Sequence, residues 1–365
     1  MKINEKVQRK SANACDLVLR CTSPSGMGIW ASCERYAHQI WTRDFVLAAA
    51  QALLLIGRRD VVATQIGELA KRQRADGKIP ILFLDDERAF LFDKISRSIK
   101  SGRWSFMLRR YFEDGGVENL SPWTKDSEVL FAICVHEHVH VAKDERFARA
   151  AAERAMDYVR MNLMKDGFIL GSDWRDTNTW LKSSALLSNN CLLYRALKSS
   201  GRCDEAEELR NRINEAFWTG TGYRDYLGVE SADAFGQALG VIHGVIPESR
   251  YPAILDSFAS LHTVRGYLSN DCRPNPTTSA ERKLLRLKRM KRSFVIWPFI
   301  HGYVILVLLR MGERELAEQA FREYTNMRGF WEYYDPKTGR GYGDKDQLWS
   351  AALYLRAASA LGNAH

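Results

Sequence analysis

The feature that most constrains the fold is a helical period that recurs along the whole chain. Stretches rich in Ala, Leu, Arg and Glu place apolar residues at i, i+3, i+4 and i+7, the spacing of one face of an α-helix. No Asn-Gly or Asp-Gly hairpin between alternating strands is evident, which argues against an all-β core. The spacing predicts twelve helices, at about residues 4–22, 43–56, 58–74, 126–141, 145–163, 181–199, 203–218, 231–243, 248–260, 297–311, 313–326 and 347–361.

The predicted helices are of two kinds that alternate along the chain. One kind is apolar nearly all round, as in residues 129–141 and 348–361, and the other carries many charges, as in 144–160 and 203–217. A helix that is apolar on every side must be buried, whereas a half-charged helix must face water. We therefore predict an all-α fold, an (α/α)6 barrel with six inner and six outer helices in a single domain, residues 1–365. A helical solenoid is the competing architecture, but the repeat consensus that solenoids usually show is not found.

Two basic segments interrupt the alternation. Residues 88–110 and residues 281–292 each carry six more positive than negative charges, which together exceed the net charge of +9. The remaining chain is mildly acidic, so the charge is local and nucleic-acid binding is not expected. We place the insertions at about 85–118 and 268–293 and expect them to form a lid or rim over the barrel mouth. Such a lid could bind an anionic substrate, a membrane surface or a partner, or could simply be solvated.

Other sequence features bear on compartment and cofactors. No apolar run reaches the length of about 18 residues that a membrane helix needs, and the first ten residues lack the apolar core of a signal peptide. The seven cysteines are scattered, with neither a C-x-x-C pair nor zinc-ligand spacing. These features predict a cytoplasmic protein with free thiols, without a metal or cofactor, and leave the oligomeric state open.

Polar and aromatic residues cluster at the joints that lead into the predicted inner helices. In a ring of inner helices these joints open at one end of the barrel. Trp beside Asp, Glu or Arg suits a carbohydrate pocket, because aromatic faces stack on sugar rings while charged groups bond the hydroxyls. For any single joint, core packing or helix capping explains the pattern equally well. The candidate substrate-binding residues are Trp41, Arg43, Asp44, Trp123, Asp126, Trp174, Arg175, Trp297, Tyr334 and Trp349.

Several segments, in order along the chain, resemble the motifs of one group of enzymes. They are Trp41-Thr-Arg-Asp44, Asp173-Trp-Arg-Asp176, residues 231–240, Val295-Ile-Trp-Pro298, and Glu332-Tyr-Tyr-Asp-Pro-Lys-Thr-Gly339 followed by Gln347-Leu-Trp-Ser-Ala-Ala352. Together they resemble the (α/α)6-barrel glycoside hydrolases that include glucoamylases, processing α-glucosidase I and the amylo-α-1,6-glucosidase part of glycogen debranching enzymes. The resemblance spans about residues 27–360, and the two basic insertions are not part of its pattern.

The resemblance implies an inverting, exo-acting hydrolase of α-glucosidic or related oligosaccharides, with paired carboxylates and no cofactor. It implies that Asp176 is the general acid and Glu332 the general base. Asp173, on the other side of Trp174, is the alternative acid. Two other functions stay open. The Asp-Trp-Arg-Asp run is also similar to the D-W-x-D of disaccharide phosphorylases, and a non-catalytic barrel could bind glycan or act as a scaffold.

Overall fold

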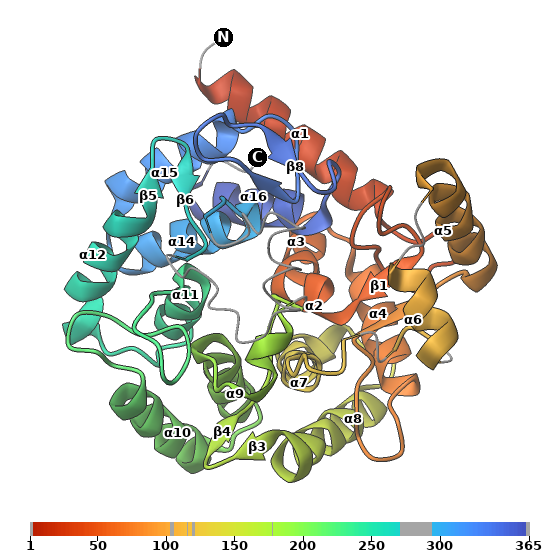
Figure 1. Ribbon diagram of the computed structural model, residues 1–365, viewed down its shortest axis with the longest axis horizontal. Helices are drawn as coiled ribbons and strands as arrows, with labels where there is room; N and C mark the ends of the chain where they lie inside the picture. Colours follow the sequence, from red (N-terminus) through yellow and green to blue (C-terminus); the bar gives the residue numbers. More distant parts are fainter. Residues whose placement is uncertain are drawn as a thin grey trace.

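The computed structural model describes residues 3–102, 106–114, 116–118, 121–176, 178–270 and 294–362. Two concentric layers of helices form a ring (Figure 1). Among these residues, no helix combines the length and the apolar character needed to cross a bilayer. Most of the second predicted insertion, residues 271–293, lies outside the described residues.

The inner layer contains the helices that the sequence marks as apolar. Each inner helix contacts the next in chain order, and α16 contacts the first, which closes the ring. Nearly all residues of α7 and α14 are buried, as expected for helices without a polar face. The inner segments are α2 (Thr42–Asp44) continued by a π-helical turn (Phe45–Ala49) and α3 (Ala50–Leu55), then α7 (Ser127–His138), α9 (Leu187–Ser199), α11 (Ala234–Ile242), α14 (Pro298–Arg310) and α16 (Leu348–Ala360).

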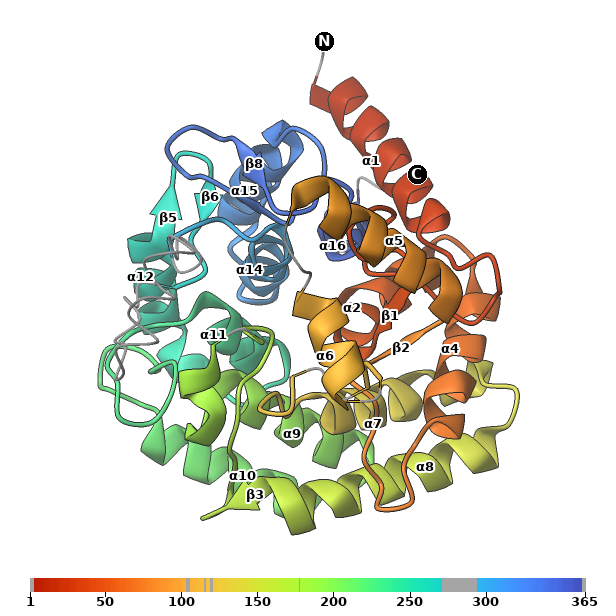
Figure 2. The same cartoon turned by 45° about the vertical axis from the view of Figure 1, so that its right-hand side comes forward.

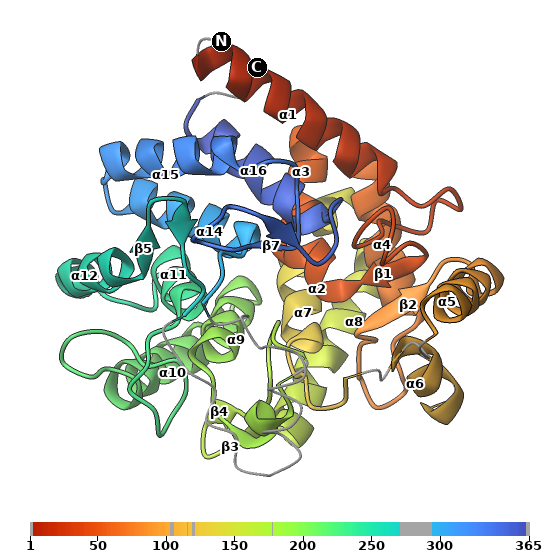
Figure 3. The ribbon, with the colours of Figure 1, turned by 45° about the horizontal axis from the view of Figure 1, so that its top comes forward.

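The outer layer contains the amphipathic helices. They are α1 (Ile3–Arg20), α4 (Arg59–Lys71), α8 (Glu145–Tyr158), α10 (Cys203–Ala216), α12 (Tyr251–Leu261) and α15 (Arg314–Asn326). Five of them pack against the inner helix that precedes them in the chain, whereas α1 packs against α16, the last inner helix (Figure 3). The predicted (α/α)6 barrel of six inner and six outer helices is therefore confirmed.

The described part of the barrel also contains four short antiparallel strand pairs. They join β1 (Gln39–Trp41) to β2 (Leu82–Leu84), β3 (Met164–Lys165) to β4 (Phe168–Ile169), β5 (His262–Thr263) to β6 (Gly266–Tyr267), and β7 (Tyr333–Tyr334) to β8 (Gly341–Tyr342). Asp166 and Gly167 form the turn between β3 and β4, with φ angles of 51° and 82°. These strands of two residues are too short to alternate, and the predicted absence of an all-β core is confirmed by the helical layers of the described chain.

The first predicted insertion contains two helices, α5 (Glu87–Ser101) and α6 (Phe106–Asp114), which lie outside β1 and β2 (Figure 2). Asp86 caps α5 by accepting a hydrogen bond of 2.9 Å from the Ala89 N–H. Phe90 packs into a small apolar cluster with Trp41 and Leu82. The buried Lys94 donates a hydrogen bond of 2.8 Å to the Arg35 carbonyl. At least one basic residue of this segment, Lys94, is therefore bonded to the barrel and does not face a ligand.

Candidate active site

The start of the first inner helix places a buried arginine between two carboxylates. The guanidinium of Arg43 binds Asp126 through two contacts, Nε to Oδ2 at 2.5 Å and Nη2 to Oδ1 at 3.1 Å. The neighbouring Asp44 is also buried, and Gln347 Nε2 lies 3.5 Å from its Oδ1. Three of the predicted sugar-binding residues, Arg43, Asp44 and Asp126, are thus brought together, with Arg43 fixing Asp126 in a planar ion pair.

The pKa of Asp44 reflects its burial and the charges around it. Burial raises the pKa of Asp44 to about 7; the positive charge of Arg43 opposes this rise, and the negative charges of Asp176 and Glu332 add to it. Asp176 also acts electrostatically on Arg43. Two remote stretches of the chain meet at Arg43 and Asp44, since Asp126 pairs with Arg43 and Gln347 lies 3.5 Å from Asp44.

Replacing Asp44 with asparagine is expected to change the pH dependence of stability. A carboxyl group whose pKa is raised by folding costs stability as pH rises from its unfolded value, about 4, through its folded value, about 7. Above pH 7, Asp44→Asn should therefore be more stable than the wild type by an amount of the order of 4 kcal/mol, and the two should be nearly equal at pH 4. Urea unfolding of both proteins between pH 4 and pH 8 measures the difference; a constant difference would contradict the assignment.

Two loops at the mouth pair to hold Asp176. The Ser172 N–H donates to the Trp123 carbonyl at 2.8 Å, and the Lys125 N–H donates to the Ser172 carbonyl at 2.9 Å. Gly171 permits this approach: it has a φ of 141°, and a Cβ atom there would lie 2.2 Å from Cγ of Lys125. The indole N–H of Trp123 donates to the backbone carbonyl of Asp176. Trp123 therefore positions the loop of Asp176, whose side chain is only partly buried.

Asp173 and Arg175, from the same loop, belong to a buried ion network. Arg175 binds both carboxylate oxygens of Asp173 at 2.9 Å and those of Asp225 at 2.5 and 2.9 Å. The Ser188 hydroxyl donates to Asp173 at 2.6 Å. Burial by itself would raise the pKa of Asp173, but Arg175 and Ser188 more than offset it and leave that pKa below its ordinary value. This environment suits a permanent anion better than a proton donor, and it occupies the guanidinium of Arg175.

Removing the cation of this network should be strongly destabilising. In Arg175→Met the carboxylates of Asp173 and Asp225 stay buried without their partner, and we expect a loss of about 3–5 kcal/mol. Arg314→Met is the matched control, because Arg314 pairs with Glu318 on the exposed face of α15 and should cost less than about 1 kcal/mol. Chemical denaturation of both variants checks the contrast, and equal losses would show that the buried network contributes nothing special.

Glu332 is held by the loop that follows β8. The Asp344 N–H donates to Oε2 of Glu332 at 3.2 Å, the Glu332 N–H donates to the Asp344 carbonyl at 2.7 Å, and Nη1 of Arg35 lies 3.5 Å from the same Oε2. Gly343, with a φ of 81°, leaves the space that Oε2 needs, because a Cβ atom there would lie 2.1 Å from it. Arg35 and Asp344 were missed by the sequence interpretation. Asp344 lies in a polar and aromatic joint, but no motif marks Arg35.

Three of the predicted tryptophans gather in one aromatic cluster. The Trp297 ring lies 5.0 Å from that of Trp174 and 5.7 Å from that of Trp349, and Phe299 stacks on Trp349 at 4.3 Å. Within the described chain, the buried indole N–H groups of Trp174 and Trp349 find no acceptor. Trp41 does not join this cluster, since it packs against the first insertion, and Trp123 braces the Asp176 loop.

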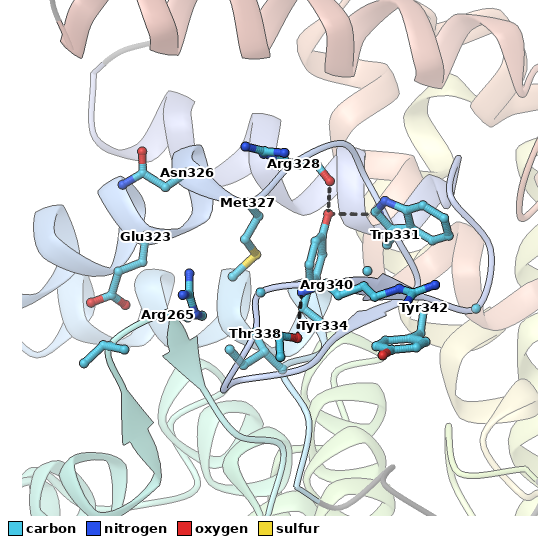
Figure 4. A pocket seen from close by; sticks show the side chains of 15 residues that line it. Arg265, Glu323, Asn326, Met327, Arg328, Trp331, Tyr334, Thr338, Arg340 and Tyr342 are labelled. Carbon is cyan, nitrogen blue, oxygen red and sulfur yellow. Dashed lines mark hydrogen bonds between the residues drawn. The ribbon is translucent and has the colours of Figure 1, made fainter.

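A hollow of about 970 Å³ lies between α15, the β5–β6 turn and the β7–β8 hairpin (Figure 4). Tyr334, predicted to contact sugar, lines this hollow. Its hydroxyl lies 2.9 Å from the carbonyl oxygens of Arg328 and Gly329 and accepts a hydrogen bond of 3.1 Å from the Trp331 N–H. Tyr334 thus fixes the loop that leads to Glu332.

Known structures share this architecture over the whole chain. A structure described as a wild-type glycosidase superposes with a TM-score of 0.69 at 15% identity, covering 99% of this chain and 98% of its own. A variant glycosidase in complex with glucose gives a TM-score of 0.66 at 15% identity, with the same coverage. The GH63 mannosylglycerate hydrolase from Thermus thermophilus, also in complex with glucose, gives 0.63 at 14% identity, covering 94% and 98%. Among curated protein sequences, none matches this chain.

The fold is that of (α/α)6-barrel glycosidases of known structure, and the predicted resemblance to this class, which includes processing α-glucosidase I, is confirmed. Residues 295–350 match the family model described as the mannosylglycerate hydrolase MGH1-like glycoside hydrolase domain. This segment contains Trp297, Glu332 and Trp349.

Proposed function

We propose that the protein hydrolyses the terminal glycosidic bond of a small α-hexoside with inversion of configuration, using Asp176 as general acid and Glu332 as general base. The proposal rests on contacts that bring the loops of both carboxylates to Arg43 and Asp44. Trp123, which bonds the Asp176 carbonyl, lies three residues before Asp126, the partner of Arg43. Gln347, which follows Glu332 in the chain, lies 3.5 Å from Asp44. Two acidic groups contributed by remote stretches of the chain to one recess are what hydrolysis of a glycoside requires.

The surroundings of each carboxylate support the division of roles. Glu332 is buried, and its carboxylate accepts a backbone N–H and has the Arg35 guanidinium 3.5 Å away, two contacts that stabilise the charged form against the cost of burial. Within the described part of its own loop, Asp176 has no such cation, because Arg175 is occupied by Asp173 and Asp225. We therefore assign the protonation of the leaving oxygen to Asp176, which is only partly buried at the loop surface, and the activation of the attacking water to Glu332.

Sugar recognition would use the recess around these groups. Asp44 and the Arg43–Asp126 pair offer acceptors and donors to hydroxyl groups, and the unpaired indole N–H groups of Trp174 and Trp349 offer two further donors. The family model that matches residues 295–350 and a similar structure are both described as mannosylglycerate hydrolases, and two similar structures hold glucose. The proposed substrate is a hexose joined to a short aglycone, neutral or acidic. Arg35 is the cation that contacts Glu332, and 54% of its side chain is exposed.

The proposal is tested by following one reaction with purified protein. A panel of α-glucosides, α-mannosides and α-hexosides of hydroxy acids is screened for sugar release, and NMR then identifies the anomer formed first. Hydrolysis of an α-linked substrate should release the β-anomer before mutarotation. Release of the α-anomer would contradict inversion. Formation of a sugar phosphate that depends on added phosphate would indicate the disaccharide phosphorylase alternative, and binding without turnover of any glycoside would indicate a non-catalytic barrel.

A further inference from the structure

Two of the chain's cysteines touch each other beside the site. The Sγ atoms of Cys21 and Cys33 lie 3.0 Å apart, and both cysteines are free thiols. Cys21 is fully buried just after α1, and Cys33 is partly exposed in the loop that follows. A disulfide bond has an S–S distance of about 2.05 Å, so a displacement of roughly 1 Å would join the two sulfurs.

The two thiols differ in a way that suits oxidation. The hydrogen bond from the Cys21 thiol and the charge of Arg20 lower the pKa of Cys33, although partial burial and Asp346 oppose this shift. Burial raises the pKa of the Cys21 thiol. Because the thiolate is the reactive form, Cys33 is the sulfur that meets an oxidant first, and Cys21 is placed to resolve the product.

The segment that contains Cys33 also holds the loop of Glu332. The Arg35 N–H donates to Oδ2 of Asp344 at 2.9 Å, the Ser32 hydroxyl donates to the same carboxylate, and the Leu348 N–H donates to the Ala31 carbonyl at 3.0 Å. Asp344 in turn donates its N–H to Glu332. A displacement of Cys33 therefore acts on residues 31–35, then on Asp344, and then on Glu332.

We propose that Cys21 and Cys33 form an oxidation site, whose disulfide form displaces Asp344 and Arg35 from Glu332 and reversibly lowers hydrolysis; the last step rests on the proposed role of Glu332. With glutathione disulfide as the oxidant, the Cys33 thiolate attacks one of its sulfurs and releases one glutathione thiolate. The Cys21 sulfur then attacks Cys33 in the mixed disulfide, gives its proton to the released thiolate and expels a second glutathione thiolate, which takes the proton that Cys33 had lost. Two protein thiols become one disulfide, and glutathione disulfide becomes two glutathione thiols.

The sequence provides a direct mass test. Trypsin cleaves after Arg20 and Arg35, and the peptide between them contains Cys21 and Cys33 without another cysteine. The full-length protein is incubated with glutathione disulfide, and its alkylated digest is compared with that of protein kept in dithiothreitol. We expect the peptide of residues 21–35 to lack both alkyl groups and to be lighter by two hydrogen atoms than the reduced peptide. We also expect kcat to fall roughly ten- to hundred-fold, because a displacement of about 1 Å at a catalytic group has effects of this size. Dithiothreitol should restore both.

Variants separate this pair from other thiols. Cys33→Ser should keep kcat both when reduced and in glutathione disulfide. Cys21→Ala should keep kcat when reduced, and in glutathione disulfide it should stop at the mixed disulfide of Cys33, because the resolving sulfur is missing. Cys203→Ser, which removes an exposed cysteine of α10, should behave like the wild type. Hydrogen exchange gives a readout that needs no substrate: the amides of Asp344 and Leu348 should exchange faster after oxidation.

The outcomes of these experiments test the oxidation site separately from the proposed hydrolase function. Absence of the linked peptide, or an equal loss of kcat in Cys33→Ser, would overturn it. A linked peptide with unchanged exchange and unchanged kcat would overturn the connection to Glu332. If no glycoside is hydrolysed at all, the proposed function fails, while peptide mass and hydrogen exchange still decide whether the thiol pair acts on the loop.

Discussion

Glu332→Gln should lower kcat about 10²- to 10⁴-fold while the folded structure is preserved. The glutamine amide can still accept the hydrogen bond from the Asp344 N–H, so the loop keeps its contact, but the amide cannot take a proton from water. The loss should be of similar size for every glycoside, whatever its leaving group, because every inverting displacement needs the activated water. Initial rates with the best substrate of the panel measure the effect.

The control for this variant is Glu315→Gln, an exposed glutamate on α15, which should retain wild-type rates. Isothermal titration calorimetry with the free hexose product should show that Glu332→Gln still binds sugar. Retention of more than about a tenth of wild-type kcat by a folded Glu332→Gln would remove Glu332 from the mechanism.

Asp176→Asn should show a loss that depends on the leaving group. With a glycoside whose leaving oxygen must be protonated, kcat/KM should fall about 10²- to 10⁴-fold, because the amide cannot donate the proton. With an α-glycosyl fluoride, whose leaving group needs no proton, most of the activity should remain. The ratio of the two rates is the measurement, and it identifies the general acid independently of any change in folding.

Asp173→Asn provides the comparison that decides between the two candidate acids. Asp173 is bound by Arg175 and Ser188, so we expect this variant to be less stable and to lower both rates by similar factors. If Asp173→Asn is the variant that keeps its activity on the glycosyl fluoride, then Asp173 is the acid and our assignment of Asp176 is wrong.

The ring of helices could be predicted because burial on every side leaves a mark in the sequence. Helix α14 has no polar face and α8 has one, and this contrast alone orders the layers. Local geometry was less accessible. Helix α9 begins at Leu187, six residues after the predicted start, because Thr179–Ser183 instead form a 3₁₀ turn. The π-helical turn Phe45–Ala49, directly after Arg43 and Asp44, has the apolar pattern of an ordinary helix.

The site residues also include some whose contacts could be predicted from the sequence and others whose contacts could not. Tryptophans that separate motifs supply, such as Trp297 and Trp349, do come together. Residue type does not reveal which partner a charged or aromatic side chain meets in space. Arg175 binds Asp225, fifty residues away, and Trp41 packs under the first insertion. Arg35 contacts Glu332 across almost the whole chain, and such long-range pairs leave no local signal.

The packing of α1 against α16 has a consequence for how the enzyme is made. Asp44 contacts Gln347, which is 303 residues later in the chain, and Arg35 contacts Asp344, which is 309 residues later. During synthesis the early segments therefore lack these contacts until the late segments have been made. Until α16 has left the ribosome, the inner wall has a gap and the recess has no Trp349. Contacts this distant in sequence slow folding, because the loop between them must be closed first. A nascent chain can therefore build most of its helices early, but it closes the inner ring only after α16 has been synthesised.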